Sequence, residues 1–312
     1  MAEKTGIWTH PSCLKHDPGP GHPEQPARLA AVLKGLSEGK LGALPRFEAP
    51  RATEADLFLV HTLDYVTELE EAFADAQEHP LALDPDTLIN DASEDAAHRA
   101  AGAGLAAANA VMEGKLQNAF CAVRPPGHHA EAGHAMGFCV FNNAAIAARH
   151  LLERHHLARV AVVDFDVHHG NGTQHVAEKD ARLFYASSHQ YPFYPGTGSP
   201  HETDKRNVVN VPLEAMSGSK SFHHAYDKVI FPALEKFAPQ FLIISAGFDA
   251  HHSDPLAQVQ LREEDFGWVT QGLMKIAARH ADGRIVSFLE GGYNLDALAA
   301  CARVHVAALA GV

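Results

Sequence analysis

The fold is decided by the stretch Val160-Ala-Val-Val-Asp164-Phe-Asp166-Val-His168-His169-Gly-Asn171-Gly. Its first half, Val160–Phe165, is a short apolar run rich in valine, which is typical of a strand buried on both faces of a sheet. Its second half is polar and rich in carboxylate and imidazole side chains. Because ligands of open parallel sheets bind beyond the carboxyl ends of the strands, the stretch predicts a buried strand that carries functional residues to that edge.

Four other runs share this character and alternate with segments in which apolar residues recur at helical spacing. The further strands are expected at Ala119–Val123, Leu183–Ala186, Phe241–Ser245 and Ile285–Leu289, and the main helices at 143–156, 221–237, 263–280 and 295–309. This alternation predicts an α/β fold with a central parallel β-sheet flanked by helices. The first 95 residues are expected to form helices and loops, with one helix beginning at Pro26.

Composition narrows the class of protein further. The 312 residues show no repeat, linker or shift in composition, so we expect a single domain over 1–312. The formal net charge of −13 argues against a nucleic-acid partner. The apolar stretch Ala100–Met112 is too short to span a membrane, and the N-terminus lacks the features of a signal peptide. Four scattered cysteines indicate reduced thiols and a cytoplasmic protein, whose oligomeric state the sequence leaves open.

Potential metal ligands follow two of the expected strands. Asp166 and His168 lie two residues apart after Val160–Phe165, and Asp249 follows Phe241–Ser245. Two carboxylates and one imidazole with an open fourth position are the ligand pattern of a catalytic zinc. A second metal at His251 is disfavoured because bridging carboxylates are not evident, and we expect His251 and His252 at the rim of the site.

Candidate catalytic groups follow the other strands. His128 and His129 come directly after Pro-Pro-Gly and suit a general base beside a protonated electrostatic partner. Asp164 and Asn171 are available to orient these two imidazoles. Tyr293, which follows Glu-Gly-Gly, suits a hydrogen-bond donor to a developing oxyanion.

Taken together, these motifs resemble the zinc-dependent histone deacetylase family, in its class II branch, within the superfamily that includes acetoin utilization proteins and acetylpolyamine amidohydrolases. The resemblance runs from His22 to the end of the chain and rests on the motifs Arg124–His129, Gly137–Cys139, Asp164–Gly172, Phe193–Gly198, Ser245–Asp249 and Leu289–Asn294. It implies an arginase-like α/β fold and hydrolysis of the acetyl amide of N6-acetyl-lysine.

The resemblance also implies a role for individual residues. Zinc would be held by Asp166, His168 and Asp249. His129 would act as base, His128 paired with Asp164 would stay cationic, and Tyr293 would hold the oxyanion. The substrate channel would be formed by the carbonyl of Gly137 and by Phe138, Tyr194 and Leu256. A structural potassium ion would be surrounded by Asp164, Asp166, His168, Ser187 and Ser188.

Departures from the family pattern bear on the substrate. Asn171 stands where class I members carry Asp, and Tyr293 stands where some class II members carry His, which favours deacetylase activity. Leu256 occupies the position of an acidic gatekeeper in polyamine-selective relatives, so acetylated lysine in a protein or peptide is favoured over an acetylated polyamine or other small amide. A non-catalytic acyl-lysine binding module is a further alternative, although it would be expected to lack one of the functional residues, and none is missing.

Overall fold

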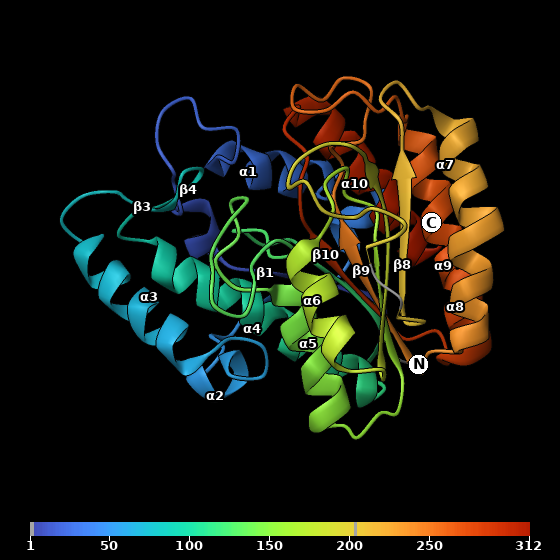
Figure 1. The fold of residues 1–312 in the computed structure, drawn as a ribbon, viewed down its shortest axis with the longest axis horizontal. Coiled ribbons are helices and arrows are strands. Elements are labelled where there is room, and N and C mark those ends of the chain that lie inside the picture. The colour runs from blue at the N-terminus through green and yellow to red at the C-terminus, as the bar shows by residue number, and fades with distance from the viewer. Residues whose placement is uncertain (1–2, 203–204) are drawn as a thin grey trace.

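A parallel sheet of eight strands runs through the part of the chain that the computed structural model describes, residues 3–202 and 205–312 (Figure 1). Its strand order is β2-β1-β5-β10-β9-β6-β7-β8, and each neighbouring pair is parallel. The strands are β1 (Glu3–Thr9), β2 (Arg46–Glu48), β5 (Leu116–Cys121), β6 (Val160–Asp164), β7 (Leu183–Gln190), β8 (Val208–Leu213), β9 (Phe241–Ala246) and β10 (Ile285–Leu289). A short antiparallel hairpin, β3 (Leu81–Asp84) and β4 (Thr87–Ile89), lies apart from this sheet.

Helices cover both faces of the sheet (Figure 1). One face packs against α4 (Ser93–Met112), α5 (Asn143–Glu153) and α6 (Asn171–Lys179), and the other against α1 (Pro26–Gly35), α7 (Ser219–Ala225), α8 (Phe231–Phe237), α9 (Glu263–His280) and α10 (Leu295–Ala310). The remaining helical elements are α2 (Glu54–Leu57), α3 (Leu63–Asp75), the 3₁₀ turns η1 (Pro11–Leu14) and η2 (Gly39–Ala43), and the π-helical turn η3 (Tyr226–Ile230).

The five strands expected from the sequence are present and lie side by side in the interior of the sheet, as β5, β10, β9, β6 and β7. Every residue of β6, β7, β9 and β10 is buried, as a strand covered on both faces by helices requires. The predicted α/β architecture with a central parallel sheet is confirmed. The helix expected to begin at Pro26 does so, because proline needs no hydrogen-bond partner at a first helical position.

The expectation of helices and loops for the first 95 residues was wrong in part. That region also contains β1, which lies between β2 and β5, and the β3–β4 hairpin. β8, at the edge of the sheet, was not predicted either; it contains Asn210 and Pro212, which weaken a strand pattern. The helix expected over 221–237 is divided, because the π-helical turn η3 separates α7 from α8.

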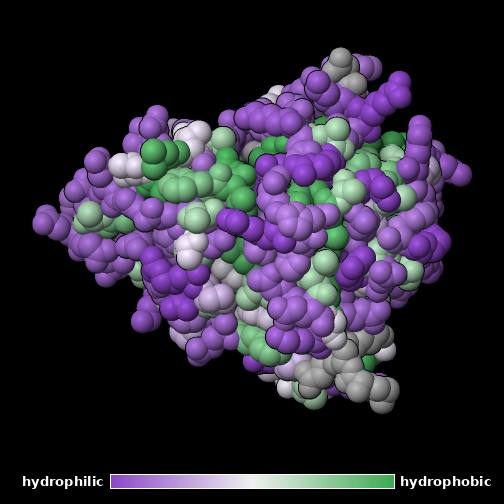
Figure 2. Space-filling model, turned by 90° about the horizontal axis from the view of Figure 1, so that it is seen from below, coloured by the Kyte–Doolittle hydropathy of each residue, from purple (hydrophilic) through white to green (hydrophobic). Residues whose placement is uncertain are grey.

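Polar residues make up most of the surface seen in Figure 2. On the face shown in Figure 2, hydrophilic residues predominate and hydrophobic residues form separate patches between them. No helix within the described residues is long and apolar enough to cross a membrane.

Candidate active site

The carboxyl ends of four neighbouring strands bring the candidate residues together. In the sheet order β5-β10-β9-β6, the segment after β5 carries His128 and His129, and the segment after β10 carries Tyr293. The segment after β9 carries Asp249, and the segment after β6 carries Asp166 together with His168. Residues up to 165 positions apart in the chain therefore meet at one edge of the sheet.

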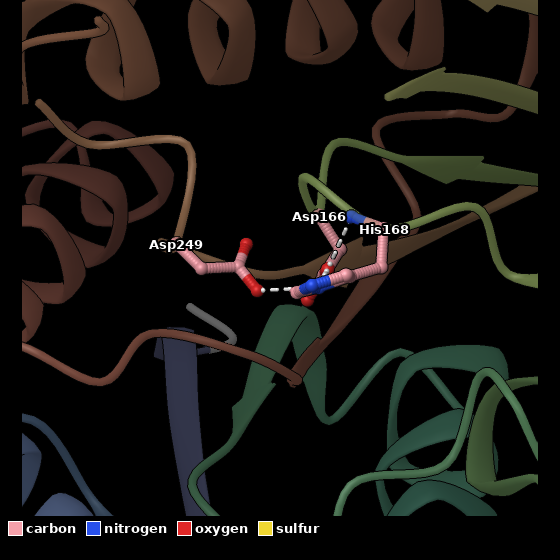
Figure 3. Close-up of side chains that lie close together, drawn as sticks. All are labelled: Asp166, His168 and Asp249. Atoms are coloured by element: carbon pink, nitrogen blue, oxygen red, sulfur yellow. Dashed lines mark hydrogen bonds and ion pairs between the residues drawn. The ribbon is translucent and has the colours of Figure 1, made fainter. Parts of the chain in front are cut away.

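Asp166, His168 and Asp249 form a compact and buried group, and their side chains point toward one another (Figure 3). One ligand atom of each lies within 4.8 Å of the others. The Nδ1 atom of His168 lies 3.1 Å from Oδ1 of Asp166 and 3.0 Å from Oδ2 of Asp249. Two carboxylates and an imidazole, each less than 9% exposed, make a donor set that can hold one metal ion.

Two glycines allow the carboxylates to approach each other so closely. A Cβ atom at Gly247 would lie 2.0 Å from Oδ2 of Asp166, and one at Gly291 would lie 2.1 Å from Oδ2 of Asp249. The backbone N–H of Gly291 also donates to Oδ2 of Asp166 at 2.7 Å. The carboxylates are therefore positioned by backbone that a larger residue would displace.

The two consecutive histidines have different partners. Nδ1 of His128 lies 3.0 Å from Oδ2 of Asp164, whereas Nδ1 of His129 lies 2.9 Å from Oδ1 of Asn171. The imidazole rings are tilted, with their centroids 4.0 Å apart. Asp164 and Asn171 were expected to orient the two imidazoles, and each lies within hydrogen-bond distance of one of them.

These different surroundings move the pKa values of the two imidazoles in opposite directions. Burial lowers the pKa of His128, but the carboxylates of Asp164 and Asp166 outweigh burial and hold it at about 10. Burial and the positive charges of His128 and His168 lower the pKa of His129 well below its usual value. The pair thus consists of one imidazole that favours the cation and one that favours the neutral base.

Tyr293 is held by contacts on three sides. Its backbone N–H donates to Oδ2 of Asp254 at 2.7 Å, and the guanidinium of Arg28 lies 4.8 Å from the centre of its ring. The next residue, Asn294, accepts a hydrogen bond from Ala297 at the start of α10. Burial raises the pKa of the Tyr293 phenol well above its usual value, so the group is a proton donor at neutral pH.

Aromatic rings line the approach to this edge. Phe138 packs edge-on against Tyr293 at 5.8 Å between centroids, and Tyr194, which is 37% exposed, packs against His129 at 5.3 Å. Gly137 has a φ of 56°, and a Cβ atom there would lie 2.4 Å from the His129 ring. Gly137 and Tyr194 therefore lie next to His129, and Phe138 lies next to Tyr293.

Leu256, Ser187 and Ser188 take positions around this centre. Leu256 lies beside Phe193 in the lining of a cavity of about 460 Å³. Ser187 and Ser188 are buried within β7, and Ser187 pairs in register with Asn210 of β8. On the other side, Ser187 lies opposite Asp164 of β6.

Several residues near the site were not singled out from the sequence. Phe193 stacks on His168 with 5.4 Å between ring centroids. Glu290 is fully buried, accepts hydrogen bonds from the backbone of Gly127 at 2.7 Å and His128 at 3.3 Å, and has its pKa raised to about 7, chiefly by burial. Phe193 is the first residue of the motif Phe193–Gly198, so that motif was the available signal, whereas the contacts of Glu290 depend on the tertiary structure.

The expectation that His251 lies at the rim was wrong. His251 is 3% exposed and its Nδ1 accepts a hydrogen bond from the backbone of Ser253 at 3.2 Å. Its other nitrogen lies 3.5 Å from Glu263, the first residue of α9, which covers this side of the loop. His252 is exposed, as expected.

Comparison with known proteins agrees with this fold. Residues 22–309 match the histone deacetylase domain family. The chain belongs to the histone deacetylase family.

Named relatives include deacetylases and an amidohydrolase. The chain is 39% identical to a "Probable deacetylase" of Archaeoglobus fulgidus, over 94% of this chain and 82% of that protein. It is 36% identical to the "Histone deacetylase-like amidohydrolase" of Pseudomonas aeruginosa, over 100% of this chain and 87% of that protein. Among solved structures, the "Crystal Structure of HDA15 HD domain" superposes with a TM-score of 0.93 at 35% identity, covering 99% of this chain and 88% of that one.

Proposed function

We propose that the chain is a zinc-dependent deacetylase that hydrolyses the acetyl amide of N6-acetyl-lysine in proteins or peptides. The observation that carries this proposal is the meeting of Asp166, His168 and Asp249 with a pair of differently tuned histidines at the carboxyl edge of the sheet. The names of the related deacetylases and amidohydrolase support the same class of reaction.

The Asp166–His168–Asp249 group fits one zinc ion. Its nitrogen and oxygen donors are of the kinds that zinc binds, and the two buried carboxylates supply negative charge that a divalent cation compensates. Bound there, zinc supplies a Lewis acid that polarises an amide carbonyl and acidifies water.

The paired histidines have different roles. Nδ1 of His129 faces Asn171, so Nε2 remains free to take a proton from water and to pass it to the leaving amine. His128 is held as a cation by Asp164 and stabilises negative charge that develops beside it.

Tyr293 completes the site as a donor to the oxyanion. Its phenol stays protonated because of burial, and its loop is fixed through Asp254. A fixed O–H donor adds stabilisation only as the carbonyl oxygen becomes negative, which is the condition for lowering the barrier.

The aromatic rings at the mouth of the site favour an extended alkyl chain. Phe138 and Tyr194 would flank the lysine methylenes, and the carbonyl of Gly137 would accept the substrate amide N–H. Leu256 adds an apolar side chain near Phe193 rather than the carboxylate that would attract a polyamine. We therefore rank acetyl-lysine above an acetylated polyamine or another small amide, and a non-catalytic acyl-lysine module last.

The remaining proposals concern the setting of the site. Backbone and side-chain oxygens at Asp164, Asp166, His168, Ser187 and Ser188 would surround a structural potassium ion beneath the zinc. We also propose that residues 1–312 act as a single catalytic domain, in the cytoplasm, with no nucleic-acid or membrane partner.

The deciding experiment compares acetate release from an acetyl-lysine peptide and from an acetylated polyamine, each with and without a zinc chelator. We expect release from the peptide that stops with the chelator and returns with added zinc. Release mainly from the polyamine would reassign the substrate, and no release from either by zinc-loaded protein would overturn the deacetylase proposal.

A further inference from the structure

The Nδ2 atom of Asn171 faces three hydrogen-bond acceptors. It lies 2.7 Å from Oε1 of Glu131, 3.3 Å from the carbonyl oxygen of His129 and 3.3 Å from Sδ of Met136. Asn171 is 3% exposed, so water does not replace these partners. The other side of the amide, Oδ1, faces Nδ1 of His129 at 2.9 Å.

The chemistry of these partners fixes which way the amide points. A carboxylate, a carbonyl and a thioether accept hydrogen bonds and have no proton to donate. If the amide of Asn171 turned over, Oδ1 would face the three acceptors. Among them the carboxylate of Glu131 makes the shortest contact and is the only one that carries a full charge, which makes its hydrogen bond the strongest.

The orientation of Asn171 in turn fixes the tautomer of His129. Because Oδ1 only accepts, Nδ1 of His129 must carry the proton, and Nε2 must hold the lone pair. A reversed amide would present Nδ2 to Nδ1 and would move the proton to Nε2, where a general base needs its lone pair.

Glu131 is itself held in place through its backbone. Its N–H donates to the carbonyl of His134 at 2.9 Å, and its carbonyl oxygen lies 2.9 Å from Nδ1 of His61. Its Oε1 also lies 3.1 Å from Nδ1 of His175, one turn beyond Asn171 on α6. The side chain is 31% exposed, between the buried amide and the surface.

We infer that Glu131 is a positioning residue for the hydrolysis: it orients the amide of Asn171 and thereby keeps His129 in the tautomer that serves as base. The inference deepens the proposed function and rests on it, since it takes His129 as the base. Where class I relatives place a carboxylate directly against the base, this chain would place an amide there and a carboxylate one residue farther out.

The experiment compares two substitutions at Glu131. Glu131→Leu removes the acceptor, and we expect kcat for the acetyl-lysine peptide to fall about 10- to 100-fold, the loss that removal of a charged hydrogen bond produces. KM and zinc content should stay unchanged. Glu131→Gln keeps an acceptor oxygen and should retain kcat within about threefold, since a neutral hydrogen bond replaces a charged one.

A matched control and a second background separate positioning from general damage. Glu178→Leu removes another half-buried glutamate of the same region, one that accepts from the amide of Gln174 at 2.9 Å but does not contact the histidines; it should leave kcat unchanged. In an Asn171→Asp background the two side-chain oxygens are equivalent, so Glu131→Leu should no longer lower kcat.

The tautomer of His129 can be measured without an activity assay. In protein labelled with ¹⁵N-histidine, the His129 signals, identified by their absence in His129→Asn, should show a protonated Nδ1 in the unsubstituted protein and in Glu131→Gln. In Glu131→Leu the proton should move toward Nε2, in zinc-free and zinc-loaded protein alike. An unchanged tautomer in Glu131→Leu, or an equal loss of kcat in the Asn171→Asp background, would overturn the inference. If the protein hydrolysed no acetyl amide at all, the proposed function would fail while the tautomer measurement still decided the part played by Glu131.

Discussion

Asp254 accepts the backbone N–H of Tyr293 at 2.7 Å through Oδ2, and the N–H of Leu256 at 3.0 Å through Oδ1. One buried carboxylate thus ties the loop that carries the Tyr293 phenol to the loop that carries Leu256. The two loops follow different strands, β10 and β9, so Asp254 couples the position of the proposed oxyanion donor, Tyr293, to that of Leu256.

Replacing Asp254 with Ala should release this tie. We expect kcat to fall about tenfold and the free energy of unfolding to fall by about 2 kcal/mol, because two hydrogen bonds to a buried carboxylate are lost. Zinc content should not change. Steady-state kinetics and urea unfolding measure both effects, and wild-type kcat in the Ala variant would show that the tie does not position Tyr293. Asp254→Asn keeps one acceptor oxygen, so its kcat and its free energy of unfolding should lie between those of wild type and those of Asp254→Ala.

Replacing Tyr293 with Phe removes only the hydroxyl. We expect kcat to fall about 100- to 1,000-fold, the usual cost of losing an oxyanion donor. The ring should keep its packing against Phe138, so zinc content and the free energy of unfolding should stay close to wild type. Near-normal turnover would remove the oxyanion role from Tyr293.

Replacing Asp249 with Ala should abolish zinc binding. The group would keep only Asp166 and His168, and a carboxylate that faces His168 at 3.0 Å would be gone. Metal analysis after dialysis measures the zinc content, with Asp254→Asn as the control that should retain one zinc per chain. A variant that kept stoichiometric zinc would show that another residue is the third ligand.

Adding a methyl group at Gly291 should disturb the same ligands without removing one. Its Cβ would lie 2.1 Å from Asp249 and 2.5 Å from Asp166, and the carboxylates would have to move apart. We expect zinc affinity in Gly291→Ala to fall at least about tenfold, as when the support of a ligand is lost. Gly218→Ala is the control, because its Cβ would meet Gln260 at an ordinary 3.6 Å; equal affinities in the two variants would contradict the steric argument.

Acid should destabilise the fold through its buried neutral histidines. His305 is fully buried between Thr270 at 2.6 Å and Ser287 at 2.8 Å, and burial lowers its pKa to about 3. The unfolded chain, with a pKa of about 6.5, binds this proton first, so stability is complete above pH 6.5 and declines as the pH falls toward 3. At pH 5 the loss from this residue should reach about 2 kcal/mol.

The variant His305→Gln tests that assignment, since its amide donates and accepts hydrogen bonds but does not titrate. Urea unfolding at pH 7 and pH 5 should give a difference between the two pH values that is about 2 kcal/mol smaller in the variant than in wild type. An identical difference in both proteins would mean that His305 does not carry this pH dependence.

Five neighbouring strands of the sheet, β5, β10, β9, β6 and β7, could be predicted from the sequence because they are largely apolar runs. β6, Val160–Asp164, is such a run, and the polar residues after it mark the carboxyl end. β1 could not be recognised in the same way, since Ile7 and Trp8 are its only large apolar residues and its place in the sheet comes from pairing with β5. β8 depends equally on its partner β7.

The candidate site was predictable to the same degree and for a similar reason. The candidate ligands and histidines stand in short motifs at strand ends, so the meeting of Asp166 with His129 at one edge could be expected from the sequence. Residues that support them could not: Glu131 becomes relevant only when α6 brings Asn171 against it, and Asp254 only when two loops meet. The prediction that His251 lies at the rim failed for the same reason, because α9 covers this residue.

The strands that carry the candidate site lie in the interior of the sheet, and the two edge strands, β2 and β8, carry none of it. Fraying of an edge would cost hydrogen bonds that no proposed ligand or catalytic residue depends on. Backbone amides of β8 should therefore exchange with solvent well before those of β6 and β9, in a protein that is still fully active. The candidate site is separated from each edge of the sheet by one strand, β1 or β7. Loss of activity under denaturing conditions should therefore coincide with opening of the central strands rather than with the first loss of structure.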